Sequence, residues 1–169
     1  MIRPLSLAFV ALLLHGCIGK VANAAEVPVH AGHVNDYANV LPTSERIELE
    51  KSLAAYEVET THQVAVLTVP SLHGESIETL SLRVARAWGL GRKGLDNGVL
   101  VTLAHSEQAV RIELGTGMSK YVSDAAAQRI LEETMLPAFR AGDLRGGLRQ
   151  GIERLLELCR AYKVSKNDE

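Results

Sequence analysis

Acidic and amide side chains stand where two glycine-rich loops join two β-prone segments of this chain. Asp96 and Asn97 close the first loop, directly before an apolar run, and Glu113 precedes the second loop, which begins at Gly115. Loops held by a rigid scaffold are common places for function. Oxygen ligands of this kind suit Ca²⁺, which takes about six to eight oxygens and tolerates irregular geometry. These joins are therefore the first candidates for a cation site.

Two further aspartates are expected at the ends of elements, and they join this candidate set. Asp36 lies in a short polar stretch before a helix, and Asp124 lies at the start of a later helix. We predict one rim that binds a divalent cation, with Ca²⁺ as the expected ion, formed by Asp36, Asp96, Asn97, Glu113 and Asp124. A purely structural alternative stays open, because Asn97-Gly98 is a turn signal, Asp36 favours an Asx-turn and Asp124 suits a helix N-cap.

Arg111 and Glu113 share the polar face of a segment whose other face is apolar. Arg111 could hold a phosphate or carboxylate in a two-pronged contact, with Glu113 as a metal ligand or base. A simple ion pair at a sheet edge explains the same pattern. The candidates for catalysis are therefore Asp96, Glu113 and Arg111, with no catalytic residue assigned. Arg92 and Lys93, on the first loop, could receive an anion or form a solvated turn.

The common catalytic motifs are missing from the sequence. It contains no G-x-S-x-G elbow, no H-E-x-x-H helix, no P-loop and no cysteine-phosphatase loop. The side chains of His62, His73 and His105 are separated along the chain, so the pattern does not support a histidine nucleophile. If the protein hydrolyses phosphoesters, attack by a metal-activated water at the acidic rim is the mechanism left.

Hydrophobic periodicity predicts the elements that must position these residues. Helical spacing is found at roughly 44–60, at 76–88, from 123 towards Pro137 and from Asp143 onward, and β-prone runs occupy 63–69, 99–104 and 109–114. The last two runs flank a polar turn and should form an antiparallel hairpin. The segment 34–41 is predicted as turns rather than a regular strand. This order predicts a three-layer α/β/α sandwich around a mixed sheet, as a single domain over 34–162.

The C-terminal part of the chain carries residues that disfavour helices. Pro137 should kink or end the third helix. Three glycines in the last helix, at 146, 147 and 151, would be explained by close packing of that helix against the sheet. The charged segment 163–169 is expected to be a frayed tail. Cys159 lies on an apolar helix face, which favours a buried, inert thiol.

The N-terminus has the pattern of a targeting segment. Arg3 precedes an apolar run at 5–14 that is too short to span a bilayer, and Ala22-Asn23-Ala24 is an A-x-A cleavage signature. We predict a signal peptide over 1–24 and a mature chain that is periplasmic or secreted. Two alternatives are a retained membrane anchor and a lipid anchor at Cys17, where residues 14–17 have the outline of a lipoprotein box. No later run reaches spanning length, so no transmembrane segment is expected in the mature chain.

Composition excludes some classes of partner. A formal net charge of −2 gives no global attraction to nucleic acid, so no nucleic-acid partner is expected. With 169 residues, 47% of them hydrophobic, the chain can bury a core without disulfides. Binding to another envelope protein is the partner class that remains open.

Four motifs, in order along the chain, resemble the TPM domain family. The first is Val34-Asn35-Asp36-Tyr37-Ala38, and the second joins Trp88-Gly89-Leu90-Gly91 to Gly94-Leu95-Asp96-Asn97-Gly98. The third is Arg111-Ile112-Glu113-Leu114-Gly115-Thr116-Gly117, and the fourth is Leu136-Pro137-Ala138-Phe139-Arg140 followed by Gly142-Asp143. The resemblance therefore covers essentially the whole mature chain.

The resemblance implies a fold and a set of functions. Members of that family include exported bacterial proteins and thylakoid-lumen proteins tied to photosystem II repair. Their fold is an α/β/α sandwich, and calcium binding and acid phosphatase activity are attributed to some of them. We therefore predict an exported TPM-domain protein that binds a divalent cation at its acidic rim, with metal-dependent acid phosphatase activity as the reaction that the family suggests. The alternative is a non-enzymatic interaction or assembly factor of the periplasm.

Overall fold

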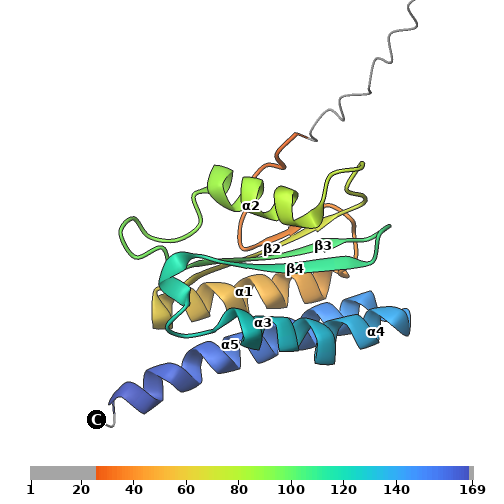
Figure 1. Ribbon diagram of the computed structural model, residues 1–169. Helices are drawn as coiled ribbons and strands as arrows, with labels where there is room; N and C mark the ends of the chain where they lie inside the picture. The colour runs from red at the N-terminus through yellow and green to blue at the C-terminus, as the bar shows by residue number, and fades with distance from the viewer. Residues whose placement is uncertain (1–25, 168–169) are drawn as a thin grey trace, which may run out of the picture.

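The computed structural model describes residues 26–167, with side chains described up to residue 160. The predicted signal peptide, Cys17 and the last two residues lie outside that range. The elements, in chain order, are β1 (Val34–Asp36), α1 (Thr43–Thr60), β2 (Gln63–Val69), α2 (Ile77–Trp88), β3 (Gly98–Ala104), β4 (Ala109–Leu114), η1 (Thr116–Met118), α3 (Asp124–Ile130), η2 (Leu131–Met135), α4 (Leu136–Arg140) and α5 (Leu144–Asn167) (Figure 1). The last helix thus continues through most of the segment expected to be a tail.

One mixed sheet organises these elements, with strand order β1-β2-β3-β4. The first three strands are parallel, and β4 runs antiparallel to β3 as the predicted hairpin. The sheet therefore has two rims. We call the rim where β1, β2 and β3 end and β4 begins the carboxyl rim, and the opposite rim, where β2 and β3 begin and β4 ends, the amino rim.

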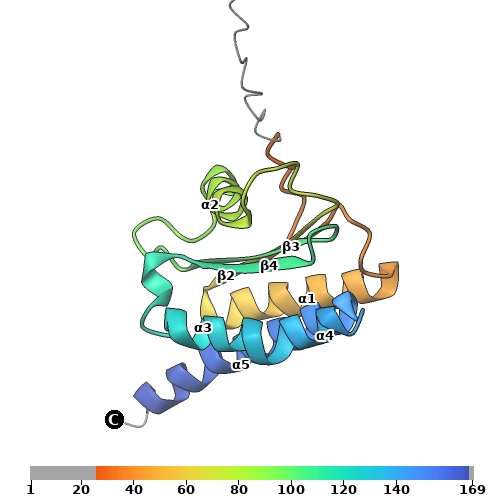
Figure 2. The ribbon, with the colours of Figure 1, turned by 45° about the vertical axis from the view of Figure 1, so that its right-hand side comes forward.

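Helices cover both faces of the sheet unequally. Helix α2 lies alone on one face, whereas α1, α3, α4 and α5 lie on the other (Figures 1 and 2). Side chains along β3 alternate between these layers: Val99, Val101 and Leu103 join the larger core, and Leu100 and Ala104 pack under α2. Because both faces are covered, β2 and β3 are continuous apolar runs. The predicted α/β fold in a single domain is confirmed.

The prediction of turns without a strand at 34–41 is wrong for its first residues. Val34–Asp36 form β1, which pairs in parallel with Val66–Thr68 of β2. The carboxylate of Glu50, on α1, accepts the backbone N–H groups of His33 at 3.0 Å and Val34 at 2.7 Å. These contacts come from residues 16 and 17 positions away, so the local sequence does not reveal them.

The C-terminal helices refine one expectation and correct another. Pro137 follows a π-helical turn, η2, and stands in the first turn of α4, so the chain stays helical through it. Proline is tolerated there because the first helical turn needs no intrahelical N–H donor. Gly147 and Gly151 do let α5 pack closely, but against Phe139 and Met135 of the neighbouring helices and not against the sheet.

Two buried hydroxyl groups lie in the thinner layer under α2. Ser81 of α2 and Thr102 of β3 are fully buried, and neither side-chain oxygen has a hydrogen-bond partner in the described part of the chain. Such groups cost stability, because folding removes their water without replacing it. Among residues 26–167, no helix is both long and apolar enough to cross a membrane.

Candidate functional site

Asp36 lies at the carboxyl rim, where its carboxylate is occupied by the fold. One of its oxygens accepts the backbone N–H of Val40 at 3.0 Å and the hydroxyl of Thr68 at 2.5 Å. The other accepts the N–H of Leu41 at 2.9 Å. The carboxylate therefore closes the turn between β1 and α1 and joins it to β2. This is the Asx-type role that the sequence left open as the alternative.

The sheet separates Asp36 from Asp96. Asp36 is level with Thr68, which is level with Leu103, whereas Asp96 precedes Gly98 at the other end of β3. The five residue steps from Gly98 to Leu103 place the rims about 17 Å apart at roughly 3.3 Å per residue. Ligand oxygens lie only about 2.3–2.6 Å from a shared Ca²⁺. The prediction that all five residues form one cation site is therefore wrong.

Asn97 is also part of the scaffold. Its amide nitrogen donates to the carbonyl of Thr61 at 2.7 Å, and its amide oxygen accepts the N–H of Arg92 at 2.8 Å. The residue is only 4% exposed. These bonds tie the loop before β3 to the end of α1, so Asn97 holds the loop and has no free face for a ligand.

Asp124 starts α3 and does not line the pocket that contains Asp96 and Glu113. The side chain of Ser123 caps the helix by accepting the N–H of Ala126 at 3.2 Å. Within the described residues, no group of three or more histidine, cysteine, aspartate or glutamate side chains is arranged to hold a metal ion. Of the five predicted residues, Asp36 and Asn97 are thus used by the fold and Asp124 lies outside the pocket. The other two lie in one pocket.

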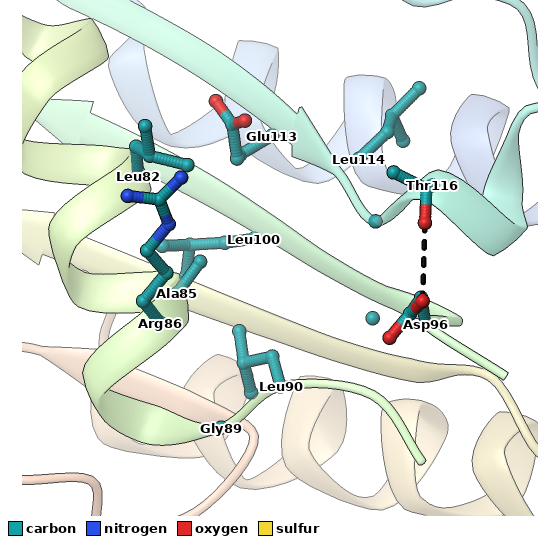
Figure 3. Close-up of a pocket in the computed structure, with 12 residues that line it drawn as sticks. Leu82, Ala85, Arg86, Gly89, Leu90, Asp96, Leu100, Glu113, Leu114 and Thr116 are labelled. Carbon is teal, nitrogen blue, oxygen red and sulfur yellow. Dashed lines mark hydrogen bonds between the residues drawn. The ribbon is translucent and has the colours of Figure 1, made fainter. Parts of the chain in front are cut away.

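That pair is Asp96 and Glu113, which line an open pocket of about 460 Å³ at the amino rim between α2 and the end of β4 (Figure 3). Asp96 lies at one end of the pocket with Thr116, and Glu113 lies on the strand that faces α2. The other lining residues are Leu82, Ala85, Arg86, Gly89, Leu90, Gly98, Leu100, Leu114, Gly115 and Thr116. An adjoining groove of about 710 Å³ shares Leu82, Arg86 and Glu113 and adds Arg83 and Arg111.

The backbone beneath Asp96 is tightly fixed. Asp96 has a φ of 46°, in the left-handed region that costs energy for any residue with a side chain. A Cβ atom on Gly115 would lie 2.1 Å from the Asp96 carbonyl, and one on Gly117 would lie 1.8 Å from the Leu95 carbonyl. The N–H of Gly117 donates to the Asp96 carbonyl at 3.0 Å. The two glycine-rich loops therefore hold each other, and only glycine fits at 115 and 117.

The Asp96 side chain contrasts with this rigid backbone. Its one hydrogen bond within the described chain is accepted from the Thr116 hydroxyl, at 3.2 Å. The residue is exposed, so its remaining lone pairs face solvent or a ligand. A carboxylate held in place but largely unpartnered can accept a cation or a hydrogen-bond donor without rearrangement of its loop.

Three arginines contribute charge to the pocket and groove, and they differ in their partners. Arg111 pairs with Glu113 at 2.9 Å, so the ion pair considered from the sequence is present. Arg83 pairs with Glu75 at 2.7 Å. The guanidinium of Arg86 has no hydrogen bond or ion pair to any side chain among residues 26–160. Arg86 borders both cavities, so its guanidinium is available to an anionic ligand there.

Sequence reasoning missed Arg86. Its spacing of three from Arg83 indicated a shared helix face, but nothing in the sequence showed that this face meets β4. By contrast, Arg92 and Lys93 do not line the pocket.

Nucleophilic side chains found elsewhere do not serve this pocket. Cys159 is buried in the larger core, as predicted, and burial raises the pKa of its thiol. The hydroxyl of Tyr56 lies 3.0 Å from Nδ1 of His62, and burial raises the pKa of that hydroxyl strongly. A raised pKa keeps both groups protonated, and a protonated thiol or phenol is a poor nucleophile.

Comparison with known proteins agrees with this architecture. Residues 34–158 match the family described as the TPM domain. The chain is similar in structure to the N-terminal domain of a protein from P. gingivalis, with 31% sequence identity and a TM-score of 0.70, over 74% of this chain and 80% of that one. Among curated proteins, none matches the chain.

Two further solved structures share the fold at lower identity. The BA42 protein from the psychrophilic bacterium Bizionia argentinensis has 22% identity and a TM-score of 0.61, over 72% of this chain and 83% of that one. The N-terminal domain of the cg2496 protein from Corynebacterium glutamicum has 20% identity and a TM-score of 0.57, over 80% and 82%.

Proposed function

This chain belongs to the TPM domain family, and we propose that it is an exported domain that binds a divalent cation, with Ca²⁺ as the expected ion, at Asp96. The observation that carries the proposal is that this residue has a rigid backbone and a largely unpartnered side chain. Its backbone is fixed in the left-handed region by two packed loops, while its side chain has a single hydrogen bond within the described part of the chain. Strained, over-determined residues of this kind cluster at binding sites.

Within the described residues, Asp96 belongs to no group of three or more metal-ligating side chains, which limits the kind of site. The Thr116 hydroxyl contacts the Asp96 carboxylate, and Glu113 lines another part of the same pocket. A Ca²⁺ ion here would complete its shell with water or with ligand oxygens. We therefore expect weak affinity in the free protein, and tighter binding when an anionic ligand fills the pocket.

Thermal unfolding with and without Ca²⁺ tests the site. An ion present at about 100 times its Kd should add about 2.7 kcal/mol to the free energy of unfolding. We expect this gain in the wild type and its loss in Asp96→Asn. Asp124→Asn is the matched control, because Asp124 is an acidic residue of the original candidate set that lies outside the pocket. An equal response to Ca²⁺ in Asp96→Asn and the wild type would contradict the proposal.

Phosphoester hydrolysis is a second candidate function, and Arg86 is the observation that favours it. A guanidinium at the border of the pocket, with no side-chain partner among residues 26–160, can bind phosphate oxygens in a two-pronged contact. A divalent cation bound at Asp96 would polarise the phosphoryl group or activate a water molecule. Glu113 is already paired with Arg111, so this carboxylate could serve as a ligand or base only at the cost of that pair.

A phosphoester screen in the presence of Ca²⁺ or Mg²⁺ tests this activity. We expect Arg86→Gln to lower kcat/KM by at least about tenfold, since a charge-assisted contact is worth about 1.5–3 kcal/mol. Arg92→Gln is the control, because it removes the same charge from outside the pocket. Equal activity in Arg86→Gln and the control would show that any hydrolysis does not depend on Arg86 in this pocket. A Ca²⁺ response without turnover would favour a non-enzymatic role in binding an envelope protein.

Export is the part of the proposal that rests on residues 1–24 alone. The intact mass of the mature protein, isolated from its native cell, distinguishes the predicted routes. We expect a chain that begins at Ala25. A lipid-modified N-terminus at Cys17 would instead indicate a tethered protein.

A further inference from the structure

The outer edge of β4 is a row of backbone groups that have no hydrogen-bond partner among residues 26–167. Gly115 donates its N–H to the carbonyl of Gly98, which lies directly opposite, at 2.8 Å. Hydrogen-bonded and non-hydrogen-bonded pairs alternate in an antiparallel ladder. Glu113 and Arg111 therefore turn their backbone groups towards β3. The N–H and C=O groups of Val110, Ile112 and Leu114 point outwards, and no hydrogen bond within the described residues reaches them.

The sequence of this edge is complementary to itself. If a second copy of β4 lies antiparallel beside the first, with Ile112 opposite Ile112, then Val110 faces Leu114 and Arg111 faces Glu113. All outward backbone groups meet outward groups in this register. The charged side chains form two opposite-charge pairs across the interface, at the non-hydrogen-bonded positions where side chains come closest.

Charge selects this register over its neighbours. Shifting one copy by two residues keeps the backbone groups facing one another, but it places Arg111 opposite Arg111 or Glu113 opposite Glu113. Like charges directly opposite each other destabilise a strand pair. A shift by one residue turns the outward backbone groups towards residues that already bond to β3. The central register is therefore the favoured one.

The surroundings of this edge suit a second copy. Arg111 and Glu113 are already paired within one chain at 2.9 Å, with side chains 38% and 19% exposed. Two copies would join their pairs into a ring of four alternating charges. Leu82 of α2 borders the same groove and is 38% exposed, so a second copy would also cover apolar surface. Natural edge strands are usually protected by charge, but opposite signs two residues apart do not repel an antiparallel copy.

We propose that two copies of this chain associate through β4 to form a continuous eight-stranded sheet with two-fold symmetry. The interface is isologous, because each residue of the strand meets its complement on the other copy. Arg111 of the second copy then lies beside Glu113 at the border of the pocket. One strand edge and its flanking side chains form a small interface, so the dimer is expected to be weak and dependent on concentration. The association requires neither the cation nor a substrate.

Sedimentation equilibrium of the mature chain, residues 25–169, from micromolar to millimolar concentration tests the proposal. We expect the wild type to approach twice the monomer mass. Arg111→Glu and Glu113→Arg each replace two opposite-charge pairs by two like-charge pairs. Each variant alone should raise the dimer Kd by at least about tenfold. Lys93→Glu, which reverses a charge outside β4, should leave the Kd within about twofold.

Mixing the two single variants gives the decisive measurement. Arg111→Glu presents only acids and Glu113→Arg presents only bases, so an equimolar mixture restores every opposite-charge pair. The mixture should dimerise at least as tightly as the wild type, and the double variant R111E/E113R should dimerise like the wild type. Recovery in the mixture also shows that both single variants are folded.

Three results would overturn the proposal. The first is a wild type that remains monomeric at millimolar concentration, which would leave the edge to a strand of a different protein. The second is a dimer whose Kd is unchanged in both single variants. The third is a mixture that associates no better than its components.

Discussion

The carboxyl and amino rims of the sheet each present an aspartate from a family motif, and the two side chains have opposite surroundings. At the carboxyl rim, Asp36 accepts three hydrogen bonds, from Val40, Leu41 and Thr68. At the amino rim, the Asp96 side chain accepts one hydrogen bond from the described residues, from Thr116. The first carboxylate serves to connect chain segments. The Asp96 carboxylate belongs to loops that are held together by other contacts.

This difference shows that the donors around a carboxylate decide its role. Around Asp36, donors from the following turn and from β2 satisfy both oxygens, which leaves little capacity for a ligand. Around Asp96, backbone N–H groups donate to backbone carbonyls and not to the carboxylate. One example is the bond from the Gly117 N–H to the Asp96 carbonyl at 3.0 Å. Rigidity at the amino rim is thus achieved with backbone groups, and the side chain is left available.

Removal of the Asp36 side chain should have the largest effect on stability. Asp36→Ala leaves two N–H groups and one hydroxyl without their acceptor, and hydrogen bonds to a charged group are worth about 1.5–3 kcal/mol each. Because such losses are not additive, we expect the free energy of unfolding to fall by about 3 kcal/mol. Urea denaturation measures it. Asp96→Ala should change it by no more than about 0.5 kcal/mol, as at other surface sites. Similar losses in both variants would remove the distinction between the rims.

The backbone packing of the amino rim should be the next most sensitive feature. Gly117→Ala places a Cβ atom 1.8 Å from the Leu95 carbonyl, so the two loops must separate. We expect a loss of about 2 kcal/mol from this overpacking. Gly94→Ala, on the same loop, meets no atom within 4 Å and carries only the strain of a φ of 80°. That control should lose about 1 kcal/mol. Thermal melts of the two variants would then differ, and equal losses would mean that the loops are not tightly packed.

Two buried threonines give a smaller test with opposite signs. The Thr68 hydroxyl donates to Asp36 and accepts the N–H of Ala38 at 3.0 Å, whereas the Thr102 hydroxyl has no partner in the described chain. Thr68→Val should therefore lower the free energy of unfolding by about 1.5 kcal/mol, and Thr102→Val should raise it by about 1 kcal/mol. Chemical denaturation of both variants measures the pair. A loss in Thr102→Val would reveal a partner for its hydroxyl.

The fold was largely predictable from local patterns. The apolar runs at 63–69 and 99–104 match β2 and β3 closely, and the polar turn before 109 correctly predicted the hairpin. The expectation failed at β1, where three residues are held by Glu50 of α1 and by pairing to β2. A short edge strand of this kind has no periodicity long enough to read, so its formation depends on contacts distant in sequence.

The candidate site was predictable only in part. Asp96 and Glu113 flank the glycine-rich loops in the sequence, and in the structure they line one pocket. Asp36 was predicted to join them because it, too, stands at the end of a predicted element. Element ends, however, lie at two rims, and the rim follows from strand direction. Arg86 was missed because it borders a pocket only when α2 packs beside β4, and the sequence does not reveal that contact.

The sequence by itself determined where the elements lie, how the hairpin turns and which side chains could bind a cation or an anion. Those properties depend on periodicity over a few residues and on the chemistry of single groups. Only the tertiary structure decided which of the acids are already in use. Hydrogen-bond donors reach Asp36 from Thr68, which is 32 residues away, and Asp96 is left open by glycines that follow it by about 20 residues. A carboxylate is free or occupied according to its neighbours in space, and these neighbours are fixed when the sheet is assembled.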